Sequence, residues 1–145
     1  MIPTIRGAQA QRSQYTRDAV YSASPVRLLT MLYDRLLLDL RRAEAAQQGE
    51  NWSVASENLL HAQAIITELS SSLKVDVWDG AEGLMAVYTH VFTAMVNANI
   101  NRDARGTAEC IALLEPLRQT WHEAAAQLPV QQPAASQTGG TLGVA

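Results

Sequence analysis

The sequence predicts an all-α fold: an antiparallel up-down four-helix bundle with a short N-terminal capping segment and a disordered C-terminal tail. Two observations predict this fold. Apolar residues recur at helical spacing in four long segments, and residues that stop or cap helices separate those segments at 48–51, 70–79 and 101–103. Four amphipathic helices joined by short loops pack most simply as an up-down bundle. In a chain of 145 residues, a hydrophobic share of 48% is enough for one core.

The first long helix is expected over 25–48. Ser24 is a good N-cap, Pro25 suits the first helical position, and Gly49 can take the left-handed C-cap conformation. The core stripe of this helix is expected to contain Leu29, Leu32, Tyr33, Leu36, Leu40 and Ala43.

Polar caps also frame the next two helices. Asn51 can cap the second helix, whereas Asp79 with Glu82 forms an acidic capping pair for the third, which ends near Asn101. The expected stripe of the second helix is Trp52, Ala55, Leu59, Ala62, Ile66, Leu69 and Leu73. That of the third is Leu84, Tyr88, Val91, Phe92 and Met95.

The last helix follows an Asp103 cap, and Pro116 is expected to kink or split it because proline removes the bond to the Ala112 carbonyl. Its expected stripe is Cys110, Ile111, Leu114, Leu117, Trp121 and Leu128. In the 70–79 connection, Val75, Val77 and Trp78 are expected to cover one end of the bundle. The chain then divides into a flexible N-terminus over 1–14, a helical bundle over 15–128 and a disordered tail over 129–145.

Composition and charge disfavour several classes of protein. A formal net charge of -3 gives no strong field for holding nucleic-acid phosphates or an acidic membrane surface. No apolar run approaches the roughly 20 residues of a membrane span. The single cysteine, Cys110, and the absence of an apolar export signal at the N-terminus predict a cytoplasmic protein.

No catalytic or metal-binding pattern stands out, so the sequence predicts a protein that is not an enzyme and needs no cofactor. The Glu-x-x-His pairs of di-iron bundles are absent. His61 and His90 fall opposite their apolar stripes, and His122 has no partner at ligand spacing. Cys110 lies on an apolar stripe, where a buried structural role is expected.

Apolar residues extend beyond the core stripes. The apolar face of the first long helix is wider than its core stripe, with Leu28, Met31 and Leu38 on one side and Leu37 on the other. The second helix has the same feature at Val54 and Ile65, and the third at Val87, Ala94 and Ala98. One interpretation is a broad core shared with neighbouring helices. The other is a groove for a partner helix, since wide exposed apolar areas mark interaction sites.

Several motifs in order resemble the flagellar secretion chaperone family, FliS. They include Tyr15-x-x-x-x-Val20-Tyr21-Ser22-Ala23-Ser24-Pro25 with Leu28-Leu29-x-Met31-Leu32-Tyr33-Asp34, then Asn58-Leu59-x-x-Ala62-Gln63-x-Ile65-Ile66-x-Glu68-Leu69. Leu84-x-x-Val87-Tyr88 and Ala98-Asn99-x-x-x-x-Asp103, with Glu109, Leu113, Leu114 and Trp121, continue the likeness.

The resemblance implies a cytoplasmic export chaperone that binds the disordered C-terminal region of flagellin, prevents premature polymerisation and presents flagellin to the flagellar type III export gate. It implies no nucleotide or metal. The flagellin groove is then expected at Leu28, Met31, Leu38, Val54, Ile65 and Val87. A lid that covers the empty groove is expected at Tyr15 and Val20. A structural homo-oligomer, a chaperone for another flagellar export substrate, and a bundle enzyme with an unrecognised site stay open as alternatives.

Overall fold

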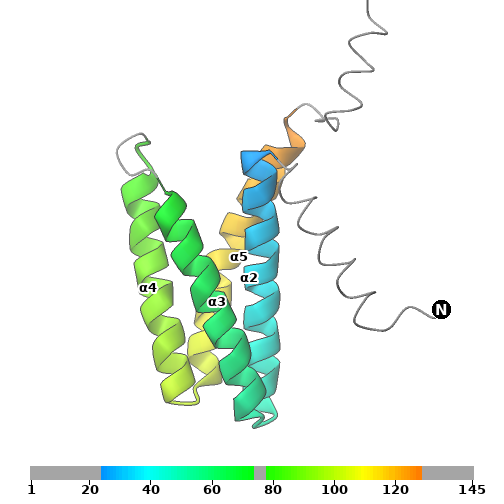
Figure 1. Ribbon diagram of the computed structural model, residues 1–145, viewed down its shortest axis with the longest axis vertical. Coiled ribbons are helices and arrows are strands. Elements are labelled where there is room, and N and C mark those ends of the chain that lie inside the picture. The colour runs from blue at the N-terminus through cyan, green and yellow to red at the C-terminus, as the bar shows by residue number, and fades with distance from the viewer. Residues whose placement is uncertain (1–23, 74–77, 129–145) are drawn as a thin grey trace, which may run out of the picture.

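The computed structural model describes residues 24–73 and 78–128, which form a bundle of four helices (Figure 1). The helices are α2 (Pro25–Gln48), α3 (Trp52–Ser72), α4 (Ala81–Ile100) and α5 (Ala104–Ala126). Both α2 and α4 pack against α3 and α5, so the helices form a ring in chain order. Consecutive helices run in opposite directions, which confirms the predicted up-down bundle. The capping segment and the tail that the sequence predicts lie outside the described residues.

Three of the four predicted N-caps are confirmed. The side chains of Ser24, Asn51 and Asp103 accept hydrogen bonds from backbone N–H groups in the first turns of α2, α3 and α5. The prediction that Asp79 caps α4 is wrong, because α4 starts one residue later, after Gly80, and no side chain caps it. The Trp78 carbonyl instead accepts from the Ala81 N–H at 3.1 Å.

The α2–α3 and α4–α5 connections share one turn geometry. Gly49 was the predicted left-handed residue, but its φ is -88°, and Glu50 takes the positive φ of 58°. Arg102 is its counterpart in the second turn, with a φ of 53°. In each turn the next residue, Asn51 or Asp103, returns its N–H to a carbonyl five positions earlier and caps the following helix. Helix α2 ends at Gln48, as expected, and the left-handed position falls one residue after Gly49.

The core confirms most of the predicted stripes. Its buried apolar members are Tyr33, Leu36, Leu37, Leu40, Ala43, Leu59, Ala62, Ile65, Ile66, Leu69, Leu84, Tyr88, Val91, Met95, Cys110 and Leu114. Leu37 belongs to this core because α2 packs against two neighbours and so needs a wide apolar arc. Phe92 and Leu128 were predicted in the stripes, but both are exposed. Leu128 lies beyond the end of α5, which explains its exposure.

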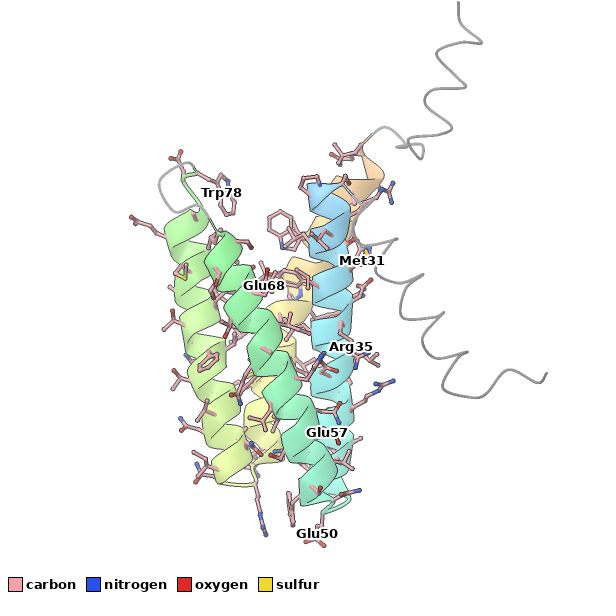
Figure 2. All side chains as sticks on the ribbon, viewed as in Figure 1. Met31, Arg35, Glu50, Glu57, Glu68 and Trp78 are labelled. Atoms are coloured by element: carbon pink, nitrogen blue, oxygen red, sulfur yellow. The ribbon has the colours of Figure 1, made fainter. Side chains whose placement is uncertain are left out.

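The end of the bundle that holds the two tight turns is closely packed. A Cβ atom added at Gly106 would lie 3.1 Å from the Ala98 Cβ, so α4 and α5 approach closely there. Gln47 is buried at the same end and bonds to both α4 and α5. Pro116 does not split α5, which continues from Ala104 to Ala126. Trp78 marks the opposite, upper end, and Glu50 the lower (Figure 2).

Candidate binding site

An apolar hollow of about 310 Å³ lies at the upper end of the bundle, where α2 and α4 begin and α3 and α5 end. We call it the mouth hollow. Its lining comes from all four helices and the turn after α3: Pro25, Leu28, Leu29, Leu32, Leu69, Ser72, Leu73, Leu84, Tyr88 and Trp121. Apart from Ser72 and the aromatic polar atoms, this lining is hydrocarbon. The mouth hollow is therefore suited to apolar side chains of a partner.

A pair of buried tyrosines lies at the mouth hollow, which Tyr88 helps to line. The hydroxyls of Tyr33 in α2 and Tyr88 in α4 are 2.6 Å apart, and one donates a hydrogen bond to the other. Burial raises the pKa of both hydroxyls, so both stay protonated at neutral pH. This contact joins the two helices that face each other across the bundle.

Two tryptophans continue the aromatic cluster toward the rim. The Trp121 ring centroid lies 6.5 Å from that of Tyr33 and 6.4 Å from that of Trp78, at spacings typical of tilted aromatic pairs. Trp78 is 48% exposed, in line with the predicted cover over one end of the bundle, whereas Val75 and Val77 lie outside the described residues. The buried indole Nε1–H of Trp121 finds no hydrogen-bond acceptor in the part of the chain that the structure describes.

The predicted groove residues do not meet in one place. Leu28 lines the mouth hollow. Met31 and Leu38 are exposed on α2, with Met31 on its outer side in Figure 2, and Val54 is exposed on α3. Ile65 is buried in the core. Val87 is half-buried and stands three turns before Ala98, on the side of α4 that faces α5.

The predicted lid residues Tyr15 and Val20 lie outside the described residues.

The comparisons with known proteins agree on one family. The family model described as "Flagellar protein FliS" matches residues 7–128. The chain belongs to the FliS family. It is 31% identical over 110 residues to the flagellar secretion chaperone FliS of Bacillus subtilis (strain 168), a match that covers 76% of this chain and 82% of that protein. With FliS of Escherichia coli (strain K12) it shares 32% identity over 120 residues, covering 81% of this chain and 88% of that protein.

A solved structure supports the FliS fold. The crystal structure of a flagellar chaperone from bacteria superposes with a TM-score of 0.66 at 16% sequence identity. The superposition covers 83% of this chain and 99% of the other.

Sequence reasoning placed the main lining residues of this FliS bundle in the core. Leu29, Leu32, Leu69, Leu84 and Trp121 were expected on core stripes, and they do point inward, but they also line the mouth hollow. Each lies within the first or last two to three turns of its helix. In an up-down bundle those turns meet at one end, and that position is the signal that could have identified them.

A buried carboxylate on α2 of this FliS was not foreseen. The Asp39 side chain is fully buried, accepts a hydrogen bond from Arg35 Nε at 3.0 Å, and contacts Nδ1 of His61 on α3. A buried charge needs such partners to offset its desolvation. His61 was expected on a solvated surface; its side chain is half exposed, yet it links α3 to α2.

Chemically reactive groups are sparse in the FliS bundle. No group of three or more His, Cys, Asp or Glu residues in 24–73 and 78–128 could hold a metal ion. Cys110 is buried, and burial raises the pKa of its thiol to about 11, which disfavours the reactive thiolate. None of the helices described here is long and apolar enough to cross a membrane.

Proposed function

We propose that this FliS protein is a cytoplasmic export chaperone that binds the disordered C-terminal region of flagellin, prevents its premature polymerisation and assists its delivery to the flagellar type III export apparatus. The observation that carries the proposal is an open apolar hollow at one end of a bundle from a secretion-chaperone family. The relatives named above are flagellar secretion chaperones, which makes an exported flagellar protein the natural client.

The apolar surface extends beyond the mouth hollow. Leu28 lines the hollow, while Met31 is 36% and Leu38 40% exposed on the same helix. These three residues are the accessible α2 part of our proposed flagellin-binding set, whose other members are the exposed Val54 on α3, the buried Ile65 and the half-buried Val87. A helix of flagellin that folds on this surface would bury apolar side chains that would otherwise drive aggregation.

Binding alone is enough for this activity, so we propose no catalysis, nucleotide or metal. A disordered segment that folds on its partner buries on the order of 1,000–3,000 Å² and loses about 2–5 kcal/mol to ordering. The result is a specific complex that can still be dissociated at the export gate.

The lid is part of the proposal. If the segment with Tyr15 and Val20 covers the empty surface, only the open fraction of molecules can bind, and the apparent affinity falls by that fraction. Tyr15→Ala should then raise the association rate of flagellin. Unchanged association and dissociation rates would remove Tyr15 from the site.

Calorimetry with purified flagellin tests the function. We expect a one-to-one complex with a negative heat-capacity change, and loss of binding when the C-terminal region of flagellin is removed. Equal binding of intact and truncated flagellin would contradict the proposal. Size-exclusion chromatography with and without flagellin distinguishes the chaperone from a structural homo-oligomer. A parallel titration with other flagellar export substrates tests whether flagellin is the client.

A further inference from the structure

The solvent side of α4 is almost free of charge. From Gly83 to Ile100 the helix contains no Asp, Glu, Lys or Arg, and His90 is its one histidine. On α3, Glu57 and Glu68 project from the side turned away from α4 (Figure 2). A solvated helix face normally carries charged residues, so this face is unusually well suited to contact with an apolar partner.

A second hollow, of about 290 Å³, lies on this side, between α3 and α4. We call it the seam hollow. Ile66, Met85 and Phe92 give it apolar walls, and Phe92 is 36% exposed. No residue that lines it is charged.

Three of the hydroxyl groups that line the seam hollow already donate hydrogen bonds within their own helices. Thr67 donates to the Gln63 carbonyl at 3.0 Å, Ser71 to the Thr67 carbonyl at 2.8 Å, and Thr89 to the Met85 carbonyl at 3.0 Å. Each of these donors is used within its own helix. A partner that packs on the seam hollow therefore leaves these three donors satisfied.

The seam hollow adjoins the mouth hollow through one side chain, because Tyr88 lines both. The mouth hollow alone, at about 310 Å³, accommodates only a few side chains, whereas a segment that folds on binding buries on the order of 1,000–3,000 Å². A client in the mouth hollow thus needs more apolar surface, and the seam hollow supplies it next to the first site.

We infer that the seam hollow between α3 and α4 is a second binding site for the flagellin client. A helical segment of the client, with an apolar and uncharged contact face, occupies it. This inference rests on the proposed function. The client runs from the mouth hollow past Tyr88 and along α4 to Phe92. A charged contact face is disfavoured because the seam hollow offers no ion-pair partner to offset desolvation.

Flagellin affinity of matched α4 variants tests the inference. Thr89→Glu places a charge in the seam hollow at an exposed helical position, and Thr89→Val keeps the site apolar. Ala112→Glu adds the same charge at an exposed position on α5. We expect Thr89→Glu to weaken flagellin binding by about tenfold or more, because the charge must be desolvated. Thr89→Val and Ala112→Glu should bind like wild type, and melting temperatures should be similar in all variants.

Leu28→Glu in the mouth hollow separates the two proposals. If wild type binds flagellin and Leu28→Glu weakens it while Thr89→Glu does not, the seam inference is wrong and the proposed function stands. If wild type does not bind flagellin, the proposed function fails, and this inference with it. Sedimentation of the protein alone tests whether a second copy of the chain occupies the seam hollow instead. A dimer that Thr89→Glu dissociates, with flagellin affinity unchanged, would show that it does and would overturn the inference.

Discussion

Gln47 and Thr107 form a buried hydrogen bond that ties α2 to α5 at the lower end of the bundle. The Thr107 hydroxyl donates to Gln47 Oε1 at 2.6 Å, and Gln47 Nε2 donates to the Ala98 carbonyl of α4 at 3.1 Å. One side chain thus connects three helices at the end opposite the mouth hollow. Because both the oxygen and the nitrogen of its amide are hydrogen-bonded, Gln47 can be buried between the helices.

Thr107→Val should destabilise the bundle without affecting its client. The substitution leaves Gln47 Oε1 buried without a donor, at a cost of about 1–3 kcal/mol in the free energy of unfolding. Urea unfolding measures this loss. Flagellin affinity should stay at the wild-type value, because the mouth hollow is at the other end. The double variant Gln47→Leu/Thr107→Val should recover part of the stability, and a double-mutant loss equal to the sum of the single losses would contradict the coupling.

The buried tyrosine pair should make stability fall at alkaline pH. Burial raises the folded-state pKa of Tyr33 and Tyr88 above the unfolded value of about 10. The native state then holds protons that the unfolded state releases, so this contribution is complete below pH 10 and is lost as pH rises above it. Urea unfolding at a series of pH values measures the slope.

Tyr33→Phe/Tyr88→Phe is the matched control for the alkaline prediction. Cys110 contributes in the same direction, because burial raises the pKa of its thiol to about 11, but this cysteine is present in both proteins. The difference in slope therefore isolates the tyrosines. Parallel pH profiles in wild type and double variant would contradict the assignment.

The positive φ at Glu50 and Arg102 predicts that glycine stabilises one turn more than the other. Glu50→Gly should add about 1 kcal/mol to the free energy of unfolding, because a left-handed conformation strains any residue with a Cβ atom. Arg102→Gly relieves the same strain but removes a guanidinium that lies 5.1 Å from the centroid of the Trp52 ring, a contact that contributes about 0.5–1 kcal/mol. Thermal unfolding should rank Glu50→Gly above Arg102→Gly, and the reverse order would show that the stacking is unimportant.

Helix bounds follow closely from local chemistry. Pro25 after Ser24 fixes the start of α2, because both residues favour a helix N-terminus whatever packs around them. The left-handed conformation of Glu50 could not be predicted from the sequence, because glutamate has no preference for positive φ. The turn hydrogen bonds impose that conformation once the helices pack.

The site was less predictable than the fold because it depends on which helix ends meet. Periodicity assigns Leu84 and Leu69 to the interior, and both are buried. It does not indicate that the interior opens at that end and leaves the same residues lining a hollow. Asp39 was missed for a related reason: its burial depends on His61 arriving from another helix.

Met31→Glu tests whether the α2 flank belongs to the client surface. Met31 is 36% exposed on the outer side of α2, so a glutamate there can stay hydrated in the empty protein, and its melting temperature should change little. In the complex, the same charge would be trapped against apolar flagellin side chains, and affinity should fall by roughly tenfold or more. Met31→Leu keeps the surface apolar and should bind like wild type. Calorimetry and thermal unfolding on the same preparations show whether a loss of binding comes from a changed surface or from an unfolded protein. If Met31→Glu lowers the melting temperature sharply and binding is lost only as the protein unfolds, Met31 supports the fold and the flank is not part of the flagellin surface.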